Sequence, residues 1–298
     1  QYSVPPMNRA LVRTQFKRNF DEYPENLFNS FDYNAFAAAT IGQVHHAKDF
    51  EGKNLVVKVQ YPNVRKSIHS DIKLLSFFGK QFFKEVDIDN YLEEIRVNLI
   101  KETDYLNEGC NIEKFRELFS QEKIIFPEYK KSTSNEQVLT MTFLEGDHLD
   151  QLLKKNPDQK KRNNYGQILW NFFHKNIDST NNTFHADVHP GNFLFSADGK
   201  VGVIDFGCIK VFPEKFIKSC VRLVKNHLKG LNDDFIYELV CMGFIKNLSN
   251  LDDKEKKIER LFRSLAKLLG SIYEKSNFDF GDKKFREDLN SLFQKGLE

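Results

Sequence analysis

The sequence predicts an α+β fold in two lobes, with a cleft between them. Three observations lead to this class: a short β-branched run early in the chain, long stretches of helical periodicity, and a small strand pair in the second half. The order is therefore a strand-rich half followed by a helical half, with the small strand pair at the junction. We place the N-terminal lobe over residues 1–145 and a helical C-terminal lobe over residues 146–298.

The composition is that of an ordinary globular protein. The 298 residues are 40% hydrophobic and 29% charged, which is too apolar for a disordered chain. Lys and Arg number 44 against 42 Asp and Glu, and the net charge of +2 indicates no nucleic-acid partner. No apolar run approaches the roughly 18 to 20 residues of a membrane-spanning helix. We attribute the 29 phenylalanines to compositional drift without functional weight.

The cysteines are scattered and form no CxxC pair: Cys110, Cys208, Cys220 and Cys241. This spacing suits neither a zinc site nor a disulfide framework, and it favours a reducing, intracellular compartment. The N-terminal segment has no apolar core of the kind found in secretory signals, so none is expected.

The N-terminal lobe is expected to begin with a helix and to continue into a sheet. Residues 1–30 are polar but carry apolar side chains in an amphipathic pattern at Leu11, Phe16 and Phe20. Residues 54–60, NLVVKVQ, form a short β-branched run bounded by a glycine and a proline. Such a run predicts a buried strand.

A helical insertion is predicted to follow that strand. From residue 63 to about residue 119 the apolar positions recur at helical spacing among many charges, and the insertion occupies about 63–90. Residues 124–143 predict two strands around the polar turn STSN at 132–135.

Helices are expected to dominate the C-terminal lobe. Residues 159–178 carry an apolar stripe, and the chain after Pro213 has helical periodicity, most clearly over 258–273. Between them, short strands at 193–195 and 201–204 flank an Ala-Asp-Gly turn.

The strongest chemical signal is HADVHPGN, followed after the strand pair by IDFG. Phosphoryl transfer needs an acid that orients a hydroxyl, and oxygen ligands for Mg²⁺. Asp187 supplies the acid, while Asn192 and Asp205 supply metal ligands, and the two acids are 18 positions apart. A single aspartate would more simply cap a turn, but this ordered set favours chemistry. His185 and His189 are assigned structural roles in the loop.

A run of small residues, AAATIGQVH, precedes the predicted strand. Ala37, Ala39 and Gly42 occupy the three glycine positions of the protein-kinase pattern GxGxxGxV. Small side chains let backbone N–H groups approach phosphate oxygens, although alanine lacks glycine's freedom at positive φ, so the loop is expected to be stiff. Six residues of this segment are candidate nucleotide-binding residues: Ala37, Ala38, Ala39, Thr40, Gly42 and Val44. Lys58, in the predicted strand 16 residues after Gly42, is a further candidate.

Together these segments resemble the UbiB-type atypical kinases, the aarF-domain proteins associated with ubiquinone biosynthesis and related prenyl-lipid metabolism. The resemblance is carried by AAATIGQVHHAK, VVKVQYPNVRKSIHSDIKLL, KETDYLNEGCNIEKFRELF, FHADVHPGNFLF and VIDFG. It runs from about Pro5 to at least Phe212. It implies a protein-kinase-like fold with an alanine-rich nucleotide loop, a helical insertion in the N-terminal lobe, and ATP or ADP with Mg²⁺ as cofactors.

The resemblance also implies a role for each matching residue. Lys58 corresponds to the strand lysine on the α- and β-phosphates, and Glu108 to the helix glutamate that pairs with it. Asp187 takes the catalytic-loop role. Asn192 and Asp205 take the Mg²⁺ roles.

Further family features map onto other positions. Glu102 and Asp104 form the family's ExD motif. The hinge segment TMTFLEG places Met141 and Phe143 beside the adenine, which backbone groups normally recognise. The family's KxGQ motif is expected to precede Val4.

The segment after the DFG motif bears on the acceptor. Only residues 208–212 separate it from Pro213, and they contain no Ser, Thr or Tyr. A protein kinase uses a longer segment there, ending in APE, as a platform for the substrate peptide. Its absence in this stretch argues against ordinary protein phosphorylation.

The function predicted is an ATP- and Mg²⁺-binding atypical kinase or ATPase that supports ubiquinone or prenyl-lipid metabolism. Expected partners are a prenyl lipid or membrane surface and quinone-biosynthesis proteins. The location would be a mitochondrial membrane in a eukaryote, or the cytoplasmic face of the inner membrane in a bacterium. Two alternatives stay open: a small-molecule phosphotransferase of the aminoglycoside- or choline-kinase type, and a nucleotide-gated scaffold without turnover. The alanine-rich loop and the ExD motif weigh against the first alternative. The intact set of Lys58, Glu108, Asp187, Asn192 and Asp205 weighs against a scaffold that has lost its catalytic residues.

Overall fold

The computed structural model describes residues 6–39, 41–82, 88–120, 122–175, 182–228, 234–246, 248 and 250–297. The chain forms two compact units, one of Gln1–Phe172 with His185–Lys210 and the other of Phe173–Phe184 with Val211–Glu298. Every predicted site residue belongs to the first unit, although Thr40 lies outside the described residues. The sequence predicts two lobes that meet after residue 145. These lobes are not the same as the two compact units, so this boundary stays a prediction.

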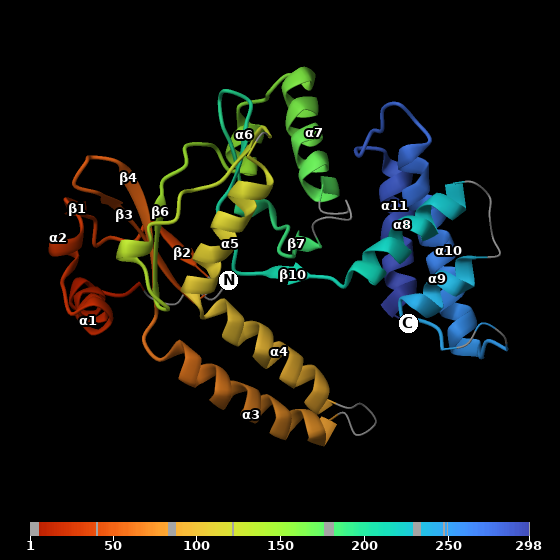
Figure 1. The fold of residues 1–298 in the computed structure, drawn as a ribbon, viewed down its shortest axis with the longest axis horizontal. Helices are drawn as coiled ribbons and strands as arrows, with labels where there is room; N and C mark the ends of the chain where they lie inside the picture. The colour runs from red at the N-terminus through yellow and green to blue at the C-terminus, as the bar shows by residue number, and fades with distance from the viewer. Residues whose placement is uncertain are drawn as a thin grey trace. The chain divides into compact units, whose positions relative to one another are not determined.

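The N-terminal sheet is built on two long antiparallel strands, β3 (Gly42–Lys48) and β4 (Asn54–Gln60) (Figure 1). On the other side of β4 lies β6 (Val138–Thr142), while β1 (Ser30–Phe31) and β2 (Ala37–Ala39) both pair with β3. The strand predicted over 54–60 is confirmed, because its last six residues are buried.

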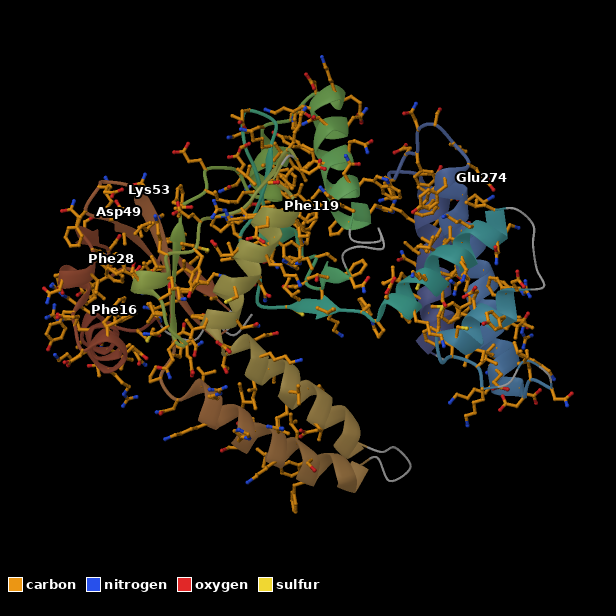
Figure 2. All side chains as sticks on the ribbon, viewed as in Figure 1. Phe16, Phe28, Asp49, Lys53, Phe119 and Glu274 are labelled. Carbon is orange, nitrogen blue, oxygen red and sulfur yellow. The ribbon has the colours of Figure 1, made fainter. Side chains whose placement is uncertain are left out.

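The leading helix is also confirmed. The side chain of Asn8 caps α1 (Arg9–Phe20) by accepting a hydrogen bond from the backbone of Leu11, and α2 (Pro24–Leu27) follows. Phe16 on α1 is fully buried, and its ring centroid lies 6.1 Å from that of Phe28 (Figure 2). These rings join Val57 and Val59 of β4 in one core, so the helix supports the strand that carries Lys58.

The helical stretch after β4 forms α3 (Val64–Phe82), α4 (Ile88–Glu102) and α5 (Tyr105–Leu118). The first two pack against each other and form the insertion, which runs to Glu102 instead of ending at about residue 90 as predicted, and α5 packs on β6 (Figure 1). Asp104 caps α5 by accepting hydrogen bonds from the backbone N–H groups of Leu106 and Asn107. The cap fixes the first residue of the helix that carries Glu108.

The two strands predicted around residues 132–135 are only partly correct. β6 is present, but the first strand is the short β5 (Ile124–Ile125), which pairs in parallel with β9 (Val201–Val203) instead of with β6. The chain between them turns at η1 (Lys131–Thr133), where Ser134 and Asn135 accept hydrogen bonds from backbone N–H groups of β6. The predicted pairing with β6 is therefore reduced to a single antiparallel bridge between Tyr129 and Met141.

The predicted hairpin in the second half is confirmed. β8 (Phe193–Phe195) pairs antiparallel with β9 around a turn in which Gly199 has a φ of +85°. Nearby elements are α6 (Leu149–Lys154), α7 (Gln159–Lys175), η2 (Pro190–Asn192), and the strands β7 (Thr183–His185) and β10 (Ile209–Val211), which pair with each other.

The second unit is helical after Pro213, as predicted. Its helices are α8 (Glu214–Leu228), α9 (Phe235–Cys241), α10 (Asp253–Tyr273) and α11 (Lys283–Leu297). The first three pack around the buried residues Leu223, Phe235, Leu239, Ile245 and Ala266, and α11 packs against α10. In the described parts of the chain, no helix has the length and apolar character needed to cross a membrane.

Candidate active site

A buried ion pair lies at the centre of the site. Nζ of Lys58, on β4, donates to Oε1 of Glu108, on α5, over 2.6 Å. The two residues are 50 positions apart in sequence and are only 6% and 3% exposed. Nζ also lies 3.4 Å from Oδ2 of Asp205. The structure therefore brings together the strand lysine, the helix glutamate and the DFG aspartate, three of the predicted site residues.

The two acids of this cluster stabilise the charge of the lysine between them. Burial alone would lower the pKa of Lys58, but the carboxylates of Asp205 and Glu108 outweigh burial and raise it. Burial acts against the charge of Asp205 as well, yet Lys58 and the backbone N–H of Gly207 lower its pKa. Burial raises the pKa of Glu108, and Lys58 opposes that effect. The lysine is therefore held as a cation between two acids.

The backbone that follows Asp205 is fixed by several contacts. Oδ1 of Asp205 accepts the N–H of Gly207 at 3.0 Å, and Oε1 of Glu108 accepts the N–H of Phe206 at 3.3 Å. His185 donates from Nε2 to the carbonyl of Asp205 at 2.7 Å, so it braces the loop as expected. Asn111 donates from Nδ2 to the carbonyl of Phe206 at 3.1 Å.

Phenylalanine side chains form the core behind these residues. Phe206 is fully buried, and its ring lies 5.6 Å from that of Phe115 and 5.7 Å from that of Phe126. Phe119, labelled in Figure 2, stacks on Phe115. The interpretation of the phenylalanines as compositional drift is therefore wrong for this group, because the rings position the DFG backbone.

The predicted catalytic loop, residues 185–192, is more exposed to solvent than the ion pair. Asp187 is exposed, and Asn192 donates from Nδ2 to its Oδ2 at 2.8 Å and to its carbonyl at 3.1 Å. His189 accepts the N–H of Gly191 through Nδ1, in keeping with a structural role. The backbone carbonyl of Asn192 accepts the N–H of Ile204. This contact ties the loop to the residue before Asp205.

The alanine run forms a strand of a tight hairpin instead of an open loop. Ala37 pairs with Val44 and Ala39 with Gly42, so the alanine strand and β3 form a tight antiparallel hairpin. A Cβ on Gly42 would lie 2.3 Å from the carbonyl oxygen of Val59. A glycine is therefore required where β3 approaches β4, whereas the alanines adopt extended backbone that any residue accepts.

Two cavities meet at Lys58. The larger, of about 520 Å³, is lined mainly by apolar side chains from the hairpin, β4 and the end of β6. It contains most of the predicted nucleotide and metal ligands: Ala37, Ala38, Ala39, Val44, Lys58, Met141, Phe143, Asn192 and Asp205.

The smaller cavity, of about 300 Å³, is acidic. It shares three lining residues with the larger cavity, namely Ala39, Lys58 and Asp205. Glu102 and Asp187 line the smaller cavity alone. Burial, followed by the charges of Asp205 and Asp187, raises the pKa of Glu102. The two residues of the predicted ExD motif thus differ, since Glu102 faces a cavity while Asp104 caps α5.

Asp205 and Asn192 fit a magnesium ion chemically, because Mg²⁺ prefers carboxylate and amide oxygens. Both side chains line the larger cavity. Among the described residues no three His, Cys, Asp or Glu side chains are grouped to hold a metal. Mg²⁺ commonly takes one or two protein ligands and completes its shell with phosphates and water, so this donor set suits a nucleotide-bound ion.

Sequence reasoning missed two residues on α5. Tyr105 lines the acidic cavity with its hydroxyl buried and without a hydrogen-bond partner in the described structure, and Asn111 contacts the DFG backbone. They lie three residues before and three residues after Glu108. The helical spacing around that glutamate was the signal that could have found them.

A strand lysine paired with a helix glutamate, next to a loop aspartate and a DFG aspartate, defines a protein-kinase-like fold. The chain belongs to the ABC1 atypical kinase-like family, whose model matches residues 1–238. This membership confirms the resemblance to the UbiB-type, aarF-domain proteins.

Individual relatives agree with that assignment. An uncharacterized aarF domain-containing chloroplastic protein kinase of Arabidopsis thaliana is 33% identical over 71% of this chain and 31% of its own length. The mitochondrial atypical kinase COQ8 of Saccharomyces cerevisiae is 29% identical over 86% of this chain and 51% of its own length. The chain thus spans about half the length, or less, of these relatives.

A solved structure shares the fold. The Rv3197–erythromycin complex from Mycobacterium tuberculosis superposes with a TM-score of 0.78 at 22% identity, over 95% of this chain and 71% of that one.

Proposed function

We propose that the chain binds ATP or ADP with Mg²⁺ and acts as a UbiB-type atypical kinase or ATPase. The observation that carries this proposal is Lys58, held between Glu108 and Asp205 where the two cavities meet. A buried cation at the border of an apolar and an acidic cavity is suited to the phosphates of a nucleotide.

The larger cavity would hold the nucleotide. Val44, Met141 and Phe143 offer apolar surface to the adenine. Lys58 would contact the α- and β-phosphates, and Asn192 and Asp205 would hold Mg²⁺, which supplies charge neutralisation to the phosphates. The alanine hairpin would cover them.

The smaller cavity would hold the acceptor. Asp187 lines it and would orient a hydroxyl or a water molecule toward the terminal phosphate. Residues 209–211 form β10 directly after the DFG motif, and α8 begins at Glu214, so these described residues build no extended platform for a peptide. This arrangement favours a small acceptor or water.

Support for a role in ubiquinone or related prenyl-lipid metabolism comes from the family. Relatives named atypical kinase COQ8 are mitochondrial in yeast and zebrafish, and plant relatives are chloroplastic. We extend the proposal to a membrane-associated location, mitochondrial in a eukaryote or at the inner face of a bacterial membrane, with a lipid surface and quinone-biosynthesis proteins as partners.

The first test is nucleotide affinity by calorimetry with Mg²⁺ and with EDTA. Asp205→Asn should weaken Mg²⁺-dependent binding by about tenfold or more while the fold stays intact, because charged contacts contribute about 1.5–3 kcal/mol. Asp150→Asn, an exposed change on α6, is the matched control and should leave binding unchanged. An unaltered Mg²⁺ dependence in Asp205→Asn would remove this residue from the metal site.

The second test is turnover. ATP hydrolysis should be measured with Mg²⁺, with and without anionic liposomes and a mimic of a ubiquinone precursor. Stimulation by the lipid or the mimic supports the proposal. Binding without turnover would favour a nucleotide-gated scaffold, and transfer to a small soluble hydroxyl compound without lipid stimulation would favour a small-molecule phosphotransferase.

A further inference from the structure

Helix α5 holds both backbone groups of Phe206. Oε1 of Glu108 accepts its N–H at 3.3 Å, and Nδ2 of Asn111 donates to its carbonyl at 3.1 Å. The ring of Phe115, from the same helix, lies 5.6 Å from the ring of Phe206. These three α5 residues are spaced at i, i+3 and i+7, so one face of the helix contacts the residue after Asp205.

The contact made by Asn111 reaches the Asp205 carboxylate through one peptide group. The peptide that carries the carbonyl of Phe206 also carries the N–H of Gly207, and that N–H donates to Oδ1 of Asp205 at 3.0 Å. Because a peptide group is planar, its carbonyl and N–H point in opposite directions and turn together. A donor that fixes the carbonyl therefore also fixes the N–H that orients the carboxylate.

We propose that Asn111 is a positioning residue for the metal ligand Asp205, a role that rests on the proposed Mg²⁺–nucleotide function. It sets the plane of the peptide between Phe206 and Gly207, which holds Oδ1 of Asp205. The other oxygen, Oδ2, then faces Lys58 at 3.4 Å. An amide is required at position 111, since a carboxylate there would meet the carbonyl oxygen of Phe206 without a proton to share.

The variant to test is Asn111→Ala, and Asn107→Ala is its matched control. Asn107 lies one turn earlier on α5 with an exposed side chain. In Asn111→Ala the Mg²⁺ concentration that half-saturates nucleotide binding should rise up to about tenfold, the factor that corresponds to about 1.4 kcal/mol. Nucleotide affinity in EDTA should change by less than about twofold. Asn111→Gln, which keeps an amide donor, should recover part of the loss.

Hydrogen exchange gives a readout that needs no nucleotide. The amide protons of Phe206 and Gly207 should exchange faster in Asn111→Ala than in the wild type, while those of the β8–β9 hairpin keep their rates. Unchanged exchange at both amides would overturn the proposed positioning role, whatever the nucleotide results. If the wild type shows no Mg²⁺-dependent binding, the proposed function fails, and with it the metal-ligand role of Asp205. An equal loss of affinity with Mg²⁺ and with EDTA would assign Asn111 a general structural role instead.

Discussion

The two sides of the site differ in the solvent exposure of their charged residues. On one side, Lys58 and Glu108 are buried between β4 and α5, and they are already paired. On the other, Asp187 is exposed on a loop, held by Asn192. Removing one partner of a buried pair leaves the other as an uncompensated charge, whereas an exposed acid is available to a ligand. Substitutions on the buried side should therefore lower the free energy of unfolding, and substitutions on the exposed side should lower turnover.

The largest effect expected on the buried side is the loss of Glu108. Glu108→Ala leaves Lys58 buried with only Asp205 near it, so the free energy of unfolding should fall by about 3 kcal/mol or more. Denaturant unfolding measures this. Replacing both partners with apolar side chains, Lys58→Met with Glu108→Leu, should recover most of the loss while abolishing nucleotide binding. A loss below about 1 kcal/mol in the single variant would contradict the distinction between the two sides.

The exposed side should respond in the opposite way. Asp187→Asn removes the proposed general base without disturbing a packed core, so turnover should fall on the order of a hundredfold or more. Unfolding free energy should change by less than about 0.5 kcal/mol, as for other exposed substitutions. Comparing kcat with the denaturation midpoint of the same sample checks both. A drop in stability equal to that of Glu108→Ala would show that the loop is part of the folding core.

Sequence patterns could single out the motif residues because those residues are adjacent in sequence or follow a recognisable strand. The side-chain positions of Lys58, Asp187, Asn192 and Asp205 around two joined cavities agree with that prediction, while their catalytic and metal roles stay proposals. The pairing of β5 with β9 could not be predicted in the same way, since a two-residue strand carries no periodic signal and its partner lies far along the chain.

A finer comparison concerns the alanine hairpin, which borders both cavities at Ala39. Its methyl groups should occupy space nearest the terminal phosphate, so the diphosphate should fit better than the triphosphate. Ala39→Gly should shift the ratio of ATP to ADP affinity toward ATP by up to about tenfold, or about 1.4 kcal/mol. Thermal-shift titrations of both nucleotides decide the matter. Equal changes in the two affinities would make the hairpin a neutral cover.

The smallest expected effect concerns Glu102, which is half-buried in the acidic cavity. Burial and the charges of Asp205 and Asp187 raise its pKa, so the folded chain holds this proton more tightly than the unfolded chain. Ionisation therefore costs stability above the ordinary pKa, and the cost disappears as the pH falls to about 4. Glu102→Gln should stabilise the fold at pH 7 by less than about 1 kcal/mol, because water screens the repulsion. A gain that persists at pH 4 would point to a cause other than charge.

The helical insertion lies in the sequence between Lys58 and Glu108, and both of its ends lie close to Gln60. Gln60, the last residue of β4, donates from Nε2 to the carbonyls of Thr103 and Glu136, at 2.8 Å and 3.1 Å. Thr103 lies between the end of α4 and the start of α5. The distance between the end of β4 and the start of α5 is therefore fixed by these hydrogen bonds and not by the length of the insertion. We therefore expect that the α3–α4 pair tolerates shortening or lengthening by whole turns without moving Lys58 relative to Glu108.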